Sequence, residues 1–98
     1  MSQSAYSWMG TRIHLVLEDD FANAYNRAQE GFFQAQRDFE AQHGTKWTGF
    51  ERIGMPWTNE ELNAWNGIAD VINLLVKLNG GSLNIPESEV TSDFLIKL

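Results

Sequence analysis

The chain has 98 residues, a formal charge of −6 from 13 acidic and 7 basic side chains, and no cysteine. This length fits one domain spanning 1–98. The lack of cysteine excludes a disulfide scaffold, a zinc–thiolate site and cysteine catalysis. Apolar residues make up 43% of the chain and aromatic residues 12%, so the chain is expected to fold around a core.

The N-terminal part of the chain divides into two segments. Residues 1–10 are small and polar without a clear period, and we expect an irregular N-terminal arm. Residues 11–17 alternate, with Ile13, Leu15 and Leu17 on one side. A period of two with β-branched residues is typical of a strand with one buried face. The sequence therefore predicts a strand over 11–17.

The next segment has an apolar residue at every third or fourth position, which predicts an amphipathic helix over 20–42. This apolar stripe comprises Phe21, Tyr25, Ala28, Phe32, Ala35 and Phe39. Gly44 is suited to a left-handed helix C-cap, whereas Gly31 weakens the helix unless close packing requires it. The stripe is expected to face the core, although its spacing also suits a dimer seam.

Residues 44–57 contain glycines, a proline and several large apolar side chains, and they are expected to form a loop. Such a loop either covers a core or presents a binding surface. Trp57 is expected to act in a hydrophobic staple at the following helix start. Trp47 and Phe50 are the candidates for exposed anchors, because bulky rings are enriched at interface hot spots.

A second helix is predicted over 58–79. Thr58 and Glu61 have the spacing of a capping box, in which each side chain accepts a hydrogen bond from the other residue's backbone N–H. Broad apolar content in the second half of the helix indicates burial on most sides or contact with a partner.

Residues 82–98 allow two interpretations. We expect a helical turn near 86–92, opened by Pro86, followed by an extended end. The alternative is a short strand over 94–98 that pairs with the strand at 11–17.

These elements together predict an α+β fold. Two antiparallel amphipathic helices would pack with an N-terminal strand and a short C-terminal extended segment. An all-α small bundle is the alternative.

The motifs of common enzymes are missing from the sequence. His14 and His43 lack metal-ligand spacing, and neither a nucleophile signature nor a phosphate-binding loop occurs. We therefore expect no enzyme activity, no cofactor and no metal. No apolar stretch reaches the ~20 residues of a membrane span, and no signal peptide is visible. The expectation is a cytoplasmic protein without membrane contact.

The acidic residues fall into groups at the two predicted helix starts: Glu18, Asp19 and Asp20 at the first, and Glu60 and Glu61 at the second. Helix capping and the helix dipole account for each group separately. An acidic surface also repels nucleic acid and attracts basic proteins. Because the starts of antiparallel helices lie at opposite ends, the sequence leaves open whether the groups converge.

The expected function is a small acidic, non-catalytic protein-binding module that inhibits or masks a basic, nucleic-acid-handling partner. In size and charge alone it is similar to phage anti-defence proteins, such as anti-CRISPR proteins and nucleic-acid mimics, and to toxin-immunity proteins. The candidate binding residues are Trp47, Phe50, Glu18, Asp19, Asp20, Glu60 and Glu61. One alternative is a homo-oligomeric structural or adaptor protein that associates through the helix at 20–42 or at 58–79. Another is a binder of a small nucleotide-like ligand with an aromatic pocket.

Overall fold

The computed structural model describes residues 2–8, 11–82, 84–85 and 88–98, and side chains within these ranges from residue 13 onwards. The elements in chain order are β1 (Ser2–Trp8), β2 (Thr11–Leu17), α1 (Asp19–His43), α2 (Asn59–Leu78), β3 (Ser88–Thr91) and α3 (Ser92–Lys97). The mixed α+β content expected from the sequence is confirmed.

Three strands form one sheet in the order β1-β2-β3. β1 is antiparallel to β2 and β3 is parallel to it, with Leu15 opposite Val90. The strand predicted over 11–17 is confirmed. The irregular arm predicted over 1–10 is wrong for Ser2–Trp8, which is a strand, and residues 1, 9 and 10 lie outside the described residues. Strand pairing uses backbone groups, which a polar run without apolar alternation supplies equally well.

The C-terminal segment differs from both interpretations of the sequence. A strand at Ser88–Thr91 comes first and a helix at Ser92–Lys97 follows, so the helical turn near 86–92 with an extended end is wrong. Pairing with β2 does occur, but through residues 88–91 rather than 94–98. Val90 of the strand and Leu95 of the helix are both buried, so both elements contribute to the core. Pro86 lies outside the described residues.

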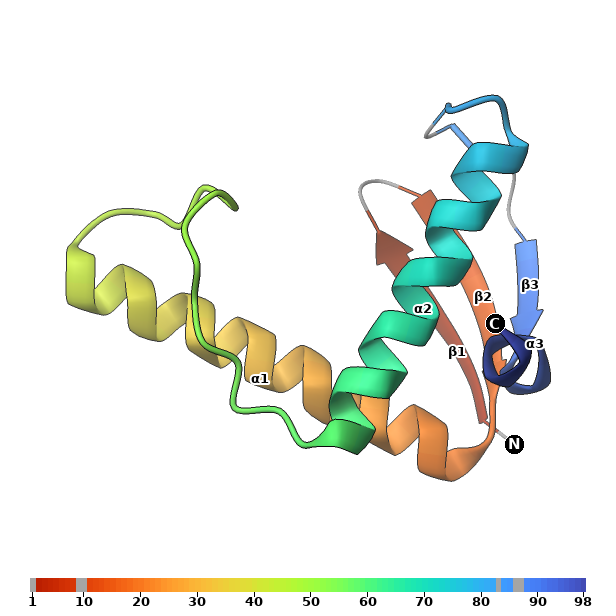
Figure 1. Cartoon of the computed structure of the whole chain (residues 1–98), viewed down its shortest axis with the longest axis horizontal. Coiled ribbons are helices and arrows are strands. Elements are labelled where there is room, and N and C mark those ends of the chain that lie inside the picture. Colours follow the sequence, from red (N-terminus) through yellow and green to blue (C-terminus); the bar gives the residue numbers. More distant parts are fainter. Residues whose placement is uncertain (1, 9–10, 83, 86–87) are drawn as a thin grey trace.

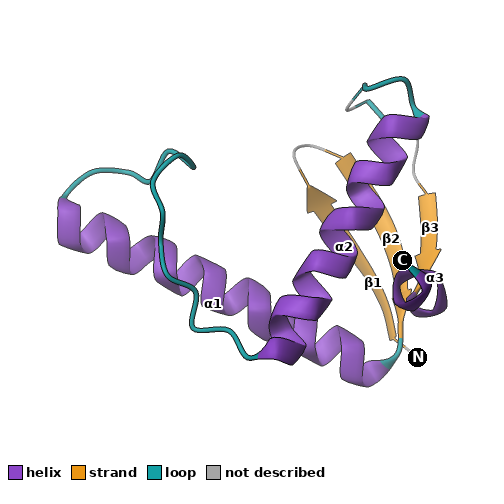
Figure 2. Ribbon diagram, viewed as in Figure 1, coloured by secondary structure: helices purple, strands orange, loops and turns teal. Residues whose placement is uncertain are grey.

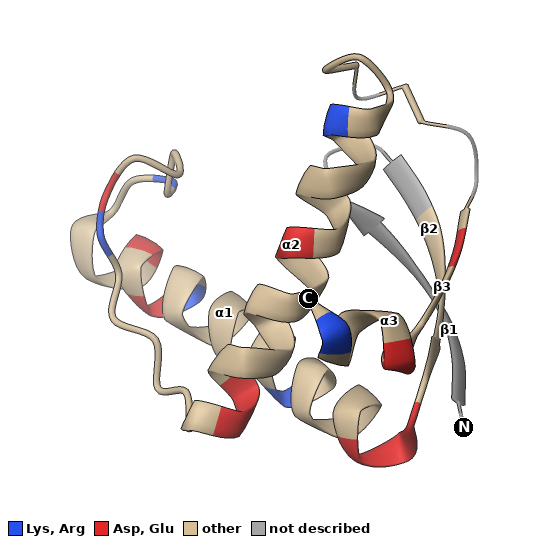
Figure 3. Ribbon diagram, turned by 45° about the vertical axis from the view of Figure 1, so that its right-hand side comes forward, with Lys and Arg blue, Asp and Glu red and all other residues tan. Residues whose placement is uncertain are grey.

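Both long helices lie on the same side of the sheet (Figures 1 and 3). The side chains of Ile13, Leu15 and Leu17 point from β2 toward α1 and α2 and are almost fully buried. The core that they share is made of Ile13, Leu15, Leu17, Ala22, Ala24, Tyr25, Ala64, Ile68, Val71, Ile72, Val90 and Leu95. In the described part of the chain, none of the helices combines the length and apolar character needed to cross a bilayer.

Only the first half of α1 belongs to this core. The helix predicted over 20–42 is confirmed, and Gly44 ends it at a φ of 68° as expected. Its buried residues are all in the first ten positions: Ala22, Ala24, Tyr25 and Ala28. The second half extends beyond α2, and the loop over 44–57 returns along it (Figure 2). The N-terminal part of the apolar stripe of α1 therefore faces the core, and its C-terminal part faces the loop.

The start of α2 is fixed against the middle of α1. The predicted capping box is confirmed: the Thr58 hydroxyl accepts a hydrogen bond from the N–H of Glu61, and a Glu61 carboxylate oxygen accepts one from the N–H of Thr58. One residue earlier, the indole N–H of Trp57 donates to the carbonyl of Ala28 at 2.8 Å. Trp57 also packs on Trp65, with ring centroids 5.1 Å apart. These contacts hold the loop and α2 to α1.

Gly31 allows the Trp57 indole to approach the backbone of α1 closely. A Cβ atom at this position would lie 2.9 Å from Nε1 and 3.1 Å from Cδ1 of Trp57, which is too close for the indole to remain in place. The glycine therefore has a packing role that outweighs its low helix propensity.

Substitution Gly31→Ala tests this role against Gly67→Ala as a matched control. A Cβ at Gly67, inside α2, would meet Phe21 at an ordinary 3.5 Å, so Gly67→Ala should stabilise the protein by about 0.5–1 kcal/mol. Gly31→Ala should instead lower the free energy of unfolding by about 1–2 kcal/mol, since displacement of Trp57 exceeds the propensity gain. Urea denaturation measures both changes. Equal stabilisation by the two substitutions would contradict the role given to Gly31.

Candidate functional site

Acidic residues from both helix starts line one hollow. Glu18 and Asp20 come from the start of α1 and Glu60 from the start of α2, and Figure 3 shows these acidic segments at the same end of the molecule. The hollow measures about 270 Å³ and is lined by Glu18, Asp20, Phe21, Ala24, Glu60, Asn63, Ala64 and Ile96. We call it the acidic hollow. The two acidic groups thus converge, which the sequence left open.

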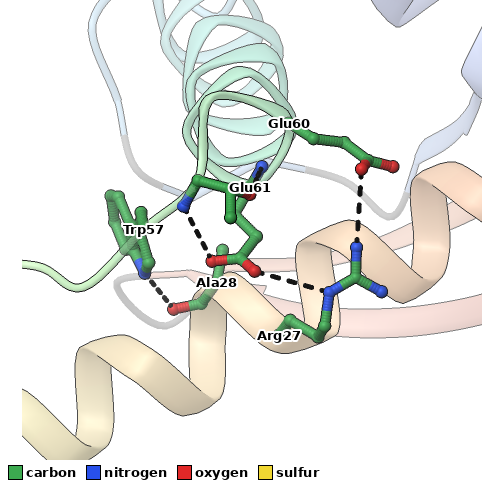
Figure 4. Close-up of polar contacts among 6 residues, drawn as sticks. Arg27, Ala28, Trp57, Glu60 and Glu61 are labelled. Atoms are coloured by element: carbon green, nitrogen blue, oxygen red, sulfur yellow. Dashed lines mark hydrogen bonds and ion pairs between the residues drawn. The ribbon is translucent and has the colours of Figure 1, made fainter.

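The position of α2 over α1 causes this convergence. Arg27, two turns into α1, forms ion pairs with Glu61 at 3.4 Å and with Glu60 at 3.8 Å (Figure 4). At the other helix start, the backbone N–H of Glu18 donates to the hydroxyl of Ser92 at 3.0 Å, which ties α1 to α3. The ion pairs thus hold the first turn of α2 to α1, and the Ser92 bond fixes Glu18 beside α3, whose Ile96 lines the same hollow.

The five acidic candidates differ in how far their carboxylates are already engaged by other groups of the protein. Glu61 is committed to the capping box and to Arg27, and its side chain is only 13% exposed. Asp19 has an interaction of its own and does not line the hollow. Glu60 is 65% exposed although Arg27 is near it. Glu18, Asp20 and Glu60 are therefore the candidates for contact with a ligand.

The charge of the hollow remains negative after the helix dipoles are considered. Each helix N-terminus acts as a positive charge of about one half. Two such ends offset about one of the three carboxylates that line the hollow, and Arg27, which Glu60 shares with Glu61, offsets part of another. The floor is formed by apolar atoms of Phe21, Ala24, Ala64 and Ile96. A group with a positive head and an aliphatic stem, such as a lysine or arginine side chain, fits this combination.

Ile96 was missed as a site residue by sequence analysis, because the C-terminal segment was expected to be extended. In the structure α3 presents Ile96 with 66% of its surface exposed. Phe21 was assigned only to the apolar stripe of the first helix, and in the structure it also lines the acidic hollow. No three His, Asp or Glu side chains among the described residues come together in a way that could hold a metal ion.

A second feature is the projecting part of the molecule, residues 31–57, which we call the aromatic arm. Phe32 packs edge-to-face on Trp47 at a centroid distance of 5.2 Å and stacks on Trp65 at 5.3 Å. Trp47 is therefore half-buried within a ring cluster, whereas Phe50 at the turn of the loop is 94% exposed. Of the two predicted anchors, Phe50 alone has its ring available to a partner.

Hydrogen bonds give the loop around Phe50 a defined shape. The indole N–H of Trp47 donates to the carbonyl of Glu51 at 3.0 Å. The hydroxyl and the backbone N–H of Thr48 donate to one Glu51 carboxylate oxygen at 2.8 Å and 3.0 Å. A carboxylate of Glu40 accepts from the backbone N–H of Trp47 at 3.1 Å and so joins the loop to α1.

The aromatic arm has no net charge. Three acids balance three bases within residues 31–57: Asp38, Glu40 and Glu51 against Arg37, Lys46 and Arg52. The full formal charge of −6 therefore belongs to the rest of the chain. The acidic hollow and the exposed ring of Phe50 are thus on electrostatically different parts of the molecule.

Comparison with known proteins gives no further guide to the site, because no family model, no curated protein and no solved structure matches this chain.

The two predicted anchors should respond differently to truncation. Trp47→Ala removes the ring contact with Phe32 and an indole hydrogen bond, and it should lower the free energy of unfolding by about 1–3 kcal/mol. Phe50→Ala should change it by less than about 0.5 kcal/mol, as is usual for an exposed position. Chemical denaturation of the two variants checks this difference. A large loss in Phe50→Ala would show that its ring is buried in solution.

The carboxyl of Glu51 should report the loop geometry through its titration. The Thr48 hydroxyl, followed by the backbone N–H groups of Glu51 and Thr48, lowers the pKa of Glu51 from its ordinary value of 4.5. A carboxyl whose pKa is lowered by folding stabilises the folded loop above pH 4.5, and this contribution is lost as the pH falls through the folded pKa. We expect Thr48→Val to raise the pKa of Glu51, as measured by carboxyl-detected NMR. An unchanged pKa would contradict the hydroxyl contact.

Proposed function

We propose that this protein is a non-catalytic module that binds and masks a basic surface of a nucleic-acid-handling protein. The observation that carries the proposal is the convergence of Glu18, Asp20 and Glu60 on one hollow with an apolar floor. Phe50, fully exposed on a shaped loop, supports it as a second point of contact.

The acidic hollow would receive a lysine or arginine side chain of the partner. Its aliphatic stem would lie against Phe21 and Ile96, and its charged head would lie among the carboxylates. The three carboxylates would stand where the partner otherwise binds phosphate oxygens, since both are anionic acceptors for the same Lys and Arg donors. Occupation of such residues blocks nucleic acid by direct competition and needs no reaction.

The acidic hollow and the ring of Phe50 would contribute differently to the binding of the partner. Exposed ion pairs are worth only about 0.2–1 kcal/mol each, because water screens them. Their main effect is on the association rate and on the choice of partner. Most of the affinity must then come from apolar contacts, for which an exposed aromatic ring such as Phe50 is typical.

The alternatives carried over from the sequence have less support. An aromatic slot for a nucleotide-like ligand would require a free ring face, but Trp65 already contacts Tyr25, Phe32 and Trp57. Self-association remains an outcome of the experiments below. We also propose that the two long helices pack antiparallel and that the protein is cytoplasmic.

Affinity capture tests the proposal with three forms of the protein. One is the unchanged chain, one carries Glu18→Gln, Asp20→Asn and Glu60→Gln, and the matched control carries Glu30→Gln, Asp38→Asn and Asp70→Asn. Each variant removes three charges, but only the first set lies in the acidic hollow. We expect the unchanged chain and the control to retain a basic nucleic-acid-binding protein from host lysate at low salt. The hollow variant should retain about tenfold less, which corresponds to about 1.4 kcal/mol.

The captured protein is then purified and its nucleic-acid affinity is measured with and without the module. Competition that weakens as salt rises would support masking. Equal retention by the hollow variant, or a partner that binds nucleic acid and the module at the same time, would exclude the proposed mechanism. A chain that captures only further copies of itself would favour the self-association alternative.

A further inference from the structure

The open edge of β3 borders a hollow that is distinct from the acidic hollow. In the described part of the chain the sheet ends at β3 (Figure 1), a strand of four residues. A hollow of about 430 Å³ is lined by Leu75, Ser88, Glu89, Val90, Thr91 and Phe94. All four residues of β3 line it, so the hollow follows the strand along its length. We call it the edge hollow.

The walls of the edge hollow are apolar on the helix side. Leu75 of α2 is half-buried against the core, and Phe94 of α3 is 43% exposed. Val90 points toward the helices, where it is buried. Because side chains alternate along a strand, Glu89 points to the opposite face, and it is exposed. One face of the strand edge is thus apolar and the other carries a carboxylate.

We propose that the edge hollow binds an extended basic peptide segment of a partner protein, which adds to the sheet as a fourth strand beside β3. Backbone hydrogen bonds along the open edge would hold the peptide, and alternate side chains would determine its sequence, as in other cases of strand addition. An apolar side chain would enter between Leu75 and Phe94. Its neighbours in the peptide would face the side of Glu89 and would be lysine or arginine.

Charge selects this occupant over a second copy of the chain. Antiparallel pairing of two β3 strands would place both Glu89 side chains on the same face, directly opposite each other when the pair is centred on residue 89, and like charges across strands are destabilising. It would also bring together two molecules that each carry a formal charge of −6. Asp93, exposed beside Phe94, adds to the negative charge at this edge. A basic segment gains from the same charges that repel a copy.

This inference goes beyond the masking function, because the edge hollow and the acidic hollow share no residue. The two sites are therefore separable by mutation. Loss of binding at one site should leave binding at the other unchanged.

A synthetic heptapeptide with lysine at odd and valine at even positions, blocked at both ends, serves as the probe. Titration into isotope-labelled full-length protein is followed by backbone amide NMR. We expect shifts concentrated at residues 88–91 and at Phe94, and slower hydrogen exchange at β3 amides. Two control peptides should bind much more weakly: one with glutamate in place of lysine, and one with proline in place of valine, which removes backbone donors.

Two variants test the walls and the charge of the site. Phe94→Ala should lower the affinity for the peptide by about tenfold. Phe33→Ala, at a phenylalanine of similar exposure on α1, should leave the affinity unchanged. Glu89→Lys alters only an exposed side chain and should also weaken binding. The triple variant of the acidic hollow should bind the peptide within about twofold of the unchanged chain.

Several results would overturn the inference. Peptide-induced shifts at the acidic hollow instead of β3 would assign the peptide to that site. Equal binding of the proline peptide would exclude strand addition. Sedimentation that shows a dimer of the unchanged chain, which Phe94→Ala dissociates, would assign the edge hollow to a second copy.

Discussion

The indole of Trp57 determines where α2 crosses α1, and the layout of both candidate surfaces depends on this crossing. Its N–H is bound to the Ala28 carbonyl, and its ring occupies the space that a side chain at Gly31 would take. Because α2 begins at this point, its first turn lies over Arg27 and close to the start of α1. The same crossing leaves the second half of α1 outside the core, where only the returning loop covers it (Figure 1).

Periodicity and capping signals predict the elements that depend on nearby residues. The strand at 11–17, both long helices, the capping box of Thr58 and the cap at Gly44 all follow from local patterns. β1 and β3 could not be predicted in this way, because their identity comes from backbone pairing with β2, and β3 lies more than seventy residues away from it. The convergence of Glu18 and Glu60 likewise follows from a helix crossing. Gly31 was the one local hint of that crossing, since a glycine within a helix lowers helix propensity unless close packing requires it.

Acidic residues at a helix start have an ordinary explanation, which is compensation of the helix dipole. That explanation suffices for Glu61, whose carboxylate caps α2 and meets Arg27. It does not account for an arrangement in which carboxylates from two helices share one hollow with an apolar floor. The three carboxylates line the same hollow, and one of them, Glu60, has Arg27 beside it at 3.8 Å. Under the proposed function, a cationic side chain of the partner in the hollow would meet carboxylates from both helix starts at once.

The length of α1 separates the charged surface from the aromatic one. A helix of 25 residues is about 37 Å long, and the acidic hollow lies at its start whereas the loop with Phe50 follows its end. Electrostatic interactions in physiological salt decay over about 8 Å, so the field of the acidic hollow is weak at the neutral aromatic arm. A partner that contacts both surfaces would be attracted and oriented at one end by charge. It would be held at the other end by a ring whose burial is insensitive to salt, and salt should therefore change how fast such a complex forms more than how slowly it dissociates.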